Sequence, residues 1–127
     1  MANDAPISVT SCLVLSNDFF FGSRLCEAIK GRGHQVTMAA TLDTSTSAMT
    51  EPAWQLIIFD LTVQTITVED AAAWRQTLKP PPPLVAFGPH VRTGQLERAK
   101  QAGCDLVLTR GQLDQQLELV LDEHLPH

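Results

Sequence analysis

Short apolar runs alternate along the chain with longer stretches of helical period. Continuous apolar runs without polar alternation are typical of strands that are covered on both faces. Five such runs predict strands over 11–15, 35–39, 54–60, 84–88 and 106–109. The run over 54–60 is the strongest and stops abruptly on Asp60, whereas the run over 35–39 is weaker and is expected nearer a sheet edge.

Helical periodicity follows four of these runs. Apolar residues repeat there at spacings of three and four, which predicts amphipathic helices. The repeats are Phe21, Leu25 and Ile29; Ala71, Trp74 and Leu78; Leu96 and Ala99; and Leu113, Leu117, Val120 and Leu121. We expect Thr67 and Thr93 to cap the second and third of these helices. Segment 41–50 is compatible with a short helix, and the prolines over 80–83 predict a stiff connector.

Five strands, each followed by a helical segment, predict one α/β domain over 1–127 with its core at about 11–123. Right-handed crossovers make this a doubly wound, five-stranded parallel sheet with helices on both faces, a flavodoxin-like three-layer sandwich. Function gathers at the carboxyl ends of the strands in such folds. The polar residues and glycine expected there are Ser16, Asn17, Asp18, Asp60, Gly88, His90, Thr109 and Arg110.

Composition narrows the class of partner. The 127 residues carry 9 Lys and Arg against 14 Asp and Glu, a net charge of −5, which argues against a nucleic-acid or anionic-membrane surface. No apolar run approaches the roughly 20 residues of a membrane helix, and an acidic N-terminus without an export signal predicts a cytoplasmic protein. Three cysteines without CxxC spacing predict buried, reduced thiols.

The sequence lacks several nucleotide-binding and flavin-binding motifs that are common in this architecture. The chain contains neither a GxxxxGK[ST] phosphate loop nor a GxGxxG after the first predicted strand, and the turn over 16–23 lacks the small residues that wrap a flavin phosphate. A serine nucleophile would need an oriented histidine base, and only His90 is expected near the strand ends. We therefore expect no enzyme activity, with an acid/base or metal cluster of His90, Asp60 and Asp18 as the enzymatic alternative.

Three segments at the strand ends resemble the receiver domain of bacterial response regulators. These are Cys12-Leu13-Val14-Leu15-Ser16-Asn17, Leu56-Ile57-Ile58-Phe59-Asp60-Leu61 and Ala102-Gly103-Cys104-Asp105-Leu106-Val107-Leu108-Thr109-Arg110. The resemblance places Asp60 on the phosphoacceptor aspartate. The chain also departs from the family pattern. Ser16 and Asn17 replace the acidic pair that follows the first strand. Gly88 replaces the switch Ser or Thr, and Arg110 replaces the lysine of that family. Gly111 follows where that family has proline, and Val107 stands where many members have an aromatic residue.

These departures predict a degenerate phosphorylation site. Phosphoryl transfer to aspartate needs Mg²⁺, which prefers carboxylate-rich oxygen ligands. Losing one unit charge about 4 Å away forfeits roughly 4 kcal/mol at an effective dielectric near 20, so we expect only weak Mg²⁺ binding. Asp18 could join Asp60 as a replacement ligand, or it could cap the first helix. Arg110 could clamp Asp60 with two parallel hydrogen bonds, and His90 is the nearest substitute donor for the missing hydroxyl.

The leading hypothesis is a stand-alone, atypical receiver-like signalling module. It would act by binding another protein, a histidine kinase or other signalling protein, with phosphorylation at Asp60 weak or absent. The alternative is a working phosphoacceptor that takes phosphate on Asp60 from a histidine kinase through a rearranged Mg²⁺ site using Asp18. The resemblance implies a partner or homodimer surface on the last two helices, comprising Gln95, Arg98, Lys100, Gln101, Gln112, Gln115 and Gln116.

Overall fold

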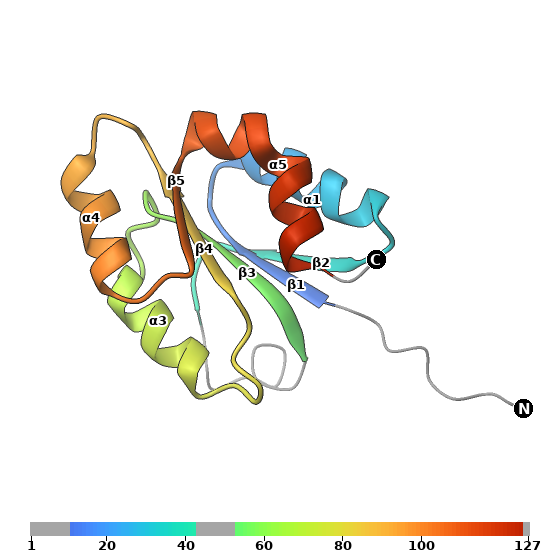
Figure 1. The fold of residues 1–127 in the computed structure, drawn as a ribbon, viewed down its shortest axis with the longest axis horizontal. Helices are drawn as coiled ribbons and strands as arrows, with labels where there is room; N and C mark the ends of the chain where they lie inside the picture. Colours follow the sequence, from blue (N-terminus) through green and yellow to red (C-terminus); the bar gives the residue numbers. More distant parts are fainter. Residues whose placement is uncertain (1–10, 43–52, 126–127) are drawn as a thin grey trace, which may run out of the picture.

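Five parallel strands form the central layer of the molecule, in the order β2-β1-β3-β4-β5 (Figure 1). The computed structural model describes residues 11–42 and 53–125. The strands are β1 (Ser11–Leu15), β2 (Gln35–Ala39), β3 (Trp54–Asp60), β4 (Leu84–Gly88) and β5 (Leu106–Thr109). All five coincide with the predicted runs, and the weaker run over 35–39 forms the edge strand β2, as expected.

The described helices are α1 (Phe19–Gly31), α3 (Val68–Gln76), α4 (Thr93–Gln101) and α5 (Arg110–His124). Helices α1 and α5 cover one face of the sheet and α3 and α4 cover the other, which gives the predicted three layers (Figure 1). The predicted fold class is thereby confirmed. The segment in which we expected a short helix, 41–50, lies almost entirely outside the described residues.

Successive residues of each strand contribute to opposite faces of the sheet. Cys12 and Val14 of β1 pack in the core beneath α1 and α5, whereas Leu13 and Leu15 pack in the core beneath α3 and α4. The same alternation continues in β3, which is paired with β1 on one side and β4 on the other. Two buried cores therefore hold β3 from both faces and fix the position of its last residue.

The ends of the helices follow local capping chemistry with one exception. Thr67 caps α3 as predicted, since its side chain accepts from the backbone N–H of Asp70 at 3.0 Å. The prediction that Thr93 caps α4 is wrong. Thr93 is the first helical residue, and the turn in which Arg92 N–H donates to the Pro89 carbonyl places Arg92 at the cap instead.

Parallel strands bring their carboxyl ends to one edge of the sheet, where β1 and β3 flank the point at which strand order reverses. The loops that follow β1, β3 and β4 meet there, beside the start of α5. Across the described residues, no helix is both long and apolar enough to cross a membrane.

Candidate functional site

Asp60 ends β3 in the interior of this edge, with only 2% of its surface exposed. Its Oδ1 accepts hydrogen bonds from the Thr62 backbone N–H at 2.9 Å and the Thr62 hydroxyl at 2.7 Å. Its Oδ2 accepts from the Ser16 hydroxyl at 2.8 Å. A buried carboxylate is tolerated when donors replace its water shell, and here three neutral donors do so.

Ser16 stands where the resemblance places the first residue of an acidic pair, and it is buried with 1% exposure. Its Oγ donates to Asp60 and accepts the backbone N–H of Asp18 at 3.1 Å. A carboxylate at position 16 would repel Asp60, whereas the hydroxyl bonds to it. Asn17, the second residue of the replaced pair, is exposed.

Asp18 caps the first helix, one of the two roles that the sequence left open. Its Oδ1 accepts from the backbone N–H groups of Phe20 and Phe21, both at 3.1 Å. Its Oδ2 pairs with the Arg110 guanidinium at 2.9 Å. Asp18 thus joins the start of α1 to the start of α5.

The predicted Arg110–Asp60 clamp is therefore wrong. Arg110 is the first residue of α5, and its guanidinium lies over the ring of Phe21, 4.9 Å from the ring centroid. From there it reaches the partly exposed carboxylate of Asp18. Asp60 is enclosed by Ser16 and Thr62, so the more accessible of the two carboxylates takes the cation.

The residues at this edge do not fit a Mg²⁺ ion. A cavity of only about 30 Å³ lies here, lined by Asp18, Asp60, Thr62, Phe87, Gly88, Pro89 and Arg110. Mg²⁺ needs near-octahedral oxygen ligands, and each of the four oxygens of Asp18 and Asp60 already accepts a protein donor. Within the described ranges, 11–42 and 53–125, no three His, Cys, Asp or Glu residues are arranged to hold a metal.

A different side chain packs tightly against the position of the missing switch side chain. A Cβ built on Gly88 would lie 3.2 Å from both Cβ and Cδ1 of Leu61. Leu61 is buried and directly follows Asp60. An apolar contact between Leu61 and Gly88 thus replaces the hydrogen-bonding group expected from the resemblance.

His90 does not take over the role of that hydroxyl. It is exposed in the loop between β4 and α4 and is not among the residues that line the cavity beside Asp60. The alternative cluster of His90, Asp60 and Asp18 is therefore not assembled in this structure.

Thr62 is the residue of this site that sequence reasoning missed. Its backbone and side chain both bond to Asp60, two residues earlier. This Asp-x-Thr spacing was a usable signal, because an aspartate often accepts from the residue two positions ahead in a turn.

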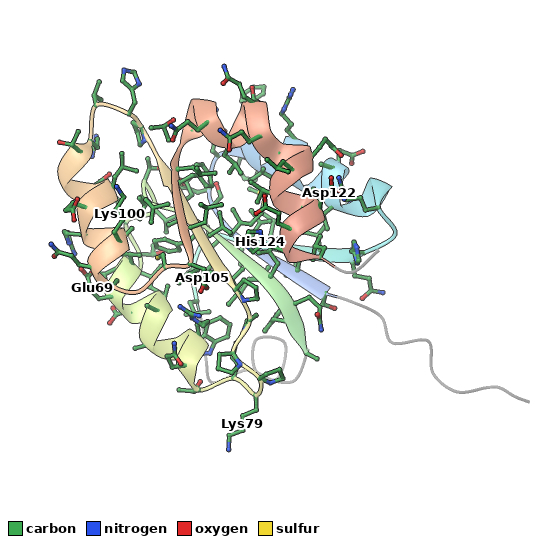
Figure 2. All side chains as sticks on the ribbon, viewed as in Figure 1. Glu69, Lys79, Lys100, Asp105, Asp122 and His124 are labelled. Atoms are coloured by element: carbon green, nitrogen blue, oxygen red, sulfur yellow. The ribbon has the colours of Figure 1, made fainter. Side chains whose placement is uncertain are left out.

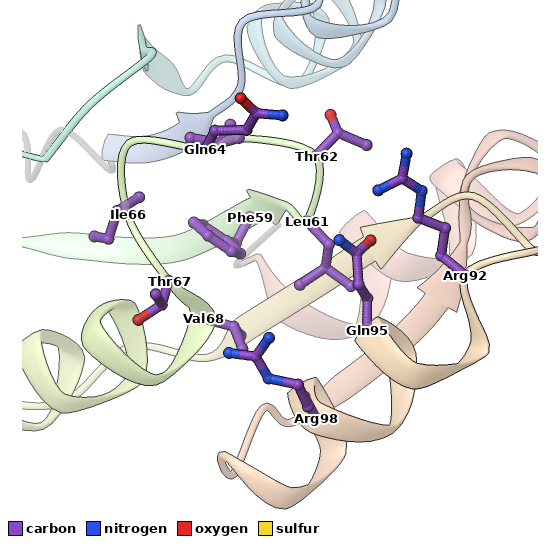
Figure 3. A pocket seen from close by; sticks show the side chains of 11 residues that line it. Phe59, Leu61, Thr62, Gln64, Ile66, Thr67, Val68, Arg92, Gln95 and Arg98 are labelled. Atoms are coloured by element: carbon purple, nitrogen blue, oxygen red, sulfur yellow. The ribbon is translucent and has the colours of Figure 1, made fainter.

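A larger cavity of about 270 Å³ lies beside this one, between the loop that follows β3 and helix α4 (Figure 3). Thr62 lines both cavities. Gln95 and Arg98 line the larger one, and Arg98 also bonds with Glu69 of α3. These two residues therefore face the α3 side, which corrects their assignment to the shared outer surface of α4 and α5.

The cysteines are free thiols, as expected for reduced cysteines, although only Cys12 is fully buried. Burial raises the pKa of Cys12 to about 12 and that of Cys104 to about 11. Burial also raises the pKa of Cys26. Because the thiolate is the reactive form, none of the three is activated as a nucleophile near neutral pH.

Comparison with known proteins gives a clear result for the fold. Neither a protein-family model nor a curated protein matches the chain in sequence. Solved structures do match, including the receiver domain of NtrX from Brucella abortus, with 17% identity and a TM-score of 0.68 over 87% of this chain and 98% of that one.

Two further structures support the same conclusion. A CheY-like receiver domain protein from Methanospirillum hungatei JF-1 matches with 17% identity and a TM-score of 0.67, over 92% of this chain and 97% of that one. The beryllofluoride-activated NtrC4 receiver domain dimer matches with 14% identity and a TM-score of 0.70, over 91% and 98% respectively. The chain has the fold of response-regulator receiver domains.

Proposed function

We propose that this protein is an atypical receiver-like signalling module that acts by binding another protein, with phosphorylation at Asp60 weak or absent. The fold supports the signalling role, since the similar structures are receiver domains. A shared fold alone does not supply a mechanism, so the proposal depends on the chemistry at the carboxyl edge of the sheet.

One observation carries the proposal: the carboxylate of Asp60 is enclosed and fully bonded by its own chain. Attack on a phosphoryl donor needs a free carboxylate oxygen and a cation to offset the developing charge. At Asp60 both oxygens accept donors from Ser16 and Thr62, and the nearby carboxylate of Asp18 is bound to Arg110. Phosphorylation of Asp60 would require breaking these hydrogen bonds. The residues at this edge do not fit the Mg²⁺ ion that ordinarily compensates for such a loss.

The packing of Leu61 on Gly88 supports a role without a phosphorylation switch. A receiver switch needs a side chain that moves when a phosphoryl group appears. Here Gly88 has no side chain at that position, and the neighbouring Leu61 is buried and cannot donate a hydrogen bond. A fixed binding surface fits this arrangement better than a surface that phosphate controls.

The outer surface of α4 and α5 remains the proposed partner surface, reduced to residues that are exposed there. These are Lys100, Gln101, Gln112, Gln115 and Gln116. Leu119 on α5 adds an apolar residue with 54% exposure. A polar surface with one apolar anchor suits a histidine kinase or another signalling protein, or a second copy of the chain, in a complex that forms and dissociates.

Intact-mass measurement after incubation with acetyl phosphate and Mg²⁺ tests the proposal. Matched samples carry Asp60→Asn or receive EDTA, and a receiver domain that forms an aspartyl phosphate under the same conditions serves as the positive control. We expect no phosphate adduct on the folded chain. An adduct that disappears in both matched samples would overturn the proposal and favour the alternative, a phosphoacceptor phosphorylated on Asp60 by a histidine kinase.

A further inference from the structure

The larger cavity is built as a small-molecule site. Its volume of about 270 Å³ is close to the lower end of ligand pockets, which run from roughly 300 to 1,000 Å³. Apolar side chains from the end of β3 to the start of α3 form much of its lining, namely Phe59, Leu61, Val63, Ile66 and Val68. Such a surface suits the flat apolar body of a small ligand.

The opposite wall is cationic. Arg92 at the cap of α4 and Gln95 and Arg98 within the helix follow one another at intervals of three, and all three line the cavity (Figure 3). Among the described residues that line the cavity there is neither Asp nor Glu, although the whole chain has a net charge of −5. Positive charge is thus concentrated where an anion would enter.

The two arginines differ in how far they are already neutralised. Arg98 holds Glu69 of α3 through two hydrogen bonds of 3.1 and 2.8 Å, and this interaction lowers the pKa of Glu69. Arg92 forms no ion pair with any described residue, is exposed and lines the cavity (Figure 3). Arg92 is therefore the group that can bind the anionic end of a ligand.

Gln95 provides an independent indication. Its Oε1 is buried and accepts no hydrogen bond from the described protein. Buried acceptors in native proteins almost always have a donor. Gln95 lines the cavity, and its Oε1, which is closed to solvent in this structure, gains a donor when the side chain turns toward a ligand there.

We infer that this cavity binds a small organic anion that has a flat apolar body and a hydrogen-bond donor. Arg92 binds the carboxylate or phosphate of the ligand, the apolar lining covers its body, and Gln95, once its side chain turns into the cavity, accepts from its hydroxyl or amino group. Arg92 selects for negative charge, and the cavity size limits the ligand to about one ring system. The inference does not depend on the proposed signalling role or on phosphorylation of Asp60.

Titration with 4-hydroxybenzoate, followed by two-dimensional ¹H–¹⁵N NMR, tests the inference. Benzoate lacks the donor, and 4-hydroxybenzamide lacks the charge. We expect saturable shifts confined to residues 59–68 and 92–98, with 4-hydroxybenzoate binding more tightly than either analogue. Phenyl phosphate in a parallel titration distinguishes a phosphate-bearing ligand from a carboxylate-bearing one.

Variants on the same helix provide the controls. Arg92→Gln should weaken binding of 4-hydroxybenzoate by about tenfold or more, because a charged hydrogen bond is lost. Lys100→Gln removes an exposed cation of α4 that does not line the cavity and is labelled in Figure 2, and it should change binding by only about twofold or less, because salt screens exposed charges outside the site. Gln95→Met should reduce the advantage of 4-hydroxybenzoate over benzoate while leaving benzoate binding in place.

Three results would overturn the inference. The first is the absence of saturable shifts with both 4-hydroxybenzoate and phenyl phosphate. The second is equal binding of 4-hydroxybenzamide, which would show that charge is not recognised. The third is an equal loss of binding in Arg92→Gln and Lys100→Gln. Equal losses would indicate nonspecific attraction of the anion to the positive charges near α4. Dispersion of the amide resonances in each variant establishes that the fold is retained. The same titration of Arg98→Gln measures the contribution of the second arginine that lines the cavity.

Discussion

The two cavities that share Thr62 differ in how completely the protein satisfies its own polar groups. Beside Asp60, the volume is about 30 Å³ and every carboxylate oxygen has a donor from the chain. Beside α4, the volume is about 270 Å³, Arg92 has no ion-pair partner among the described residues and the Oε1 of Gln95 has no donor. In the first region the protein satisfies its own carboxylates. In the second region Arg92 and Gln95 have polar groups that a bound molecule could satisfy.

This difference bears on the proposed function. Asp60 lies at the carboxyl edge of the sheet, and Ser16 and Thr62 beside it satisfy its carboxylate. A buried acceptor without a donor costs stability, so the Oε1 of Gln95 beside the larger cavity needs a reason that the first region does not.

Asp60→Ala should give the largest effect, because it breaks the first region at its centre. Removing the carboxylate leaves the buried Ser16 hydroxyl and the Thr62 donors without their acceptor. We expect the free energy of unfolding to fall by about 2–4 kcal/mol, measured by urea denaturation.

Asp60→Asn is the matched control. The amide oxygen can still accept from Thr62 and the amide N–H can donate to Ser16, so the loss should stay below about 1 kcal/mol. If Asp60→Ala instead equalled or exceeded the wild-type stability, Asp60 would carry unbalanced charge and would not be a satisfied structural group.

Gly88→Thr should have the next largest effect. It restores a hydroxyl at the switch position, but its Cβ meets Leu61 atoms at 3.2 Å. Overpacking of this kind costs about 1–3 kcal/mol, to be measured by the same denaturation. In a double-mutant cycle, Leu61→Ala should relieve part of that loss, with a coupling of about 1 kcal/mol. Strictly additive losses would show that Leu61 does not pack tightly against the switch position.

The pair between Asp18 and Arg110 should have a smaller effect, since it lies at the partly exposed boundary of the first region. Asp18→Ala removes both the helix cap and the ion pair and should cost about 1–2 kcal/mol. Arg110→Ala loses only the pair and the contact with Phe21, and should cost about 0.5–1 kcal/mol.

Salt concentration separates these two contributions. Because salt screens exposed charges, the cost of Arg110→Ala should shrink in 1 M NaCl while most of the Asp18→Ala cost remains. An Arg110→Ala variant with the wild-type denaturation midpoint at low salt would show that the pair does not stabilise the fold.

The strands could be predicted from sequence because their signal is local. An unalternated run such as 84–88 has one stable environment, a sheet covered on both faces, so its bounds follow from composition. The end of β3 on Asp60 was equally local. Helix starts were less certain, as Thr93 shows, because a turn formed four residues earlier decided which carbonyl begins α4.

The partners of the site residues could not be predicted in the same way. The choice of Asp18 over Asp60 by Arg110 depends on where the first turns of α1 and α5 lie in space. The larger cavity is hidden in the sequence for the same reason, since its walls are about 30 residues apart along the chain. Gln95 and Arg98 showed only as polar positions on a helix, and their direction was set by packing of α4 against the sheet and α3.

Gln95→Met should give the smallest effect and one of opposite sign. Methionine has a similar length and helix propensity to glutamine but no polar atom that requires a donor. Removing the unpartnered Oε1 from its buried position should raise the free energy of unfolding by about 0.5–1 kcal/mol. Gln101→Met, at an exposed position of the same helix, should leave stability unchanged within about 0.5 kcal/mol.

A loss of stability in Gln95→Met would mean that the protein itself already satisfies the Gln95 amide. The two cavities would then not differ in how their polar groups are satisfied. A gain in Gln95→Met with none in Gln101→Met would show that the native chain keeps a destabilising residue at this one position. An unpartnered acceptor benefits the protein only when a donor reaches it. A rise in the free energy of unfolding for Gln95→Met and a fall for Asp60→Ala would therefore distinguish a residue selected for binding from one selected for stability.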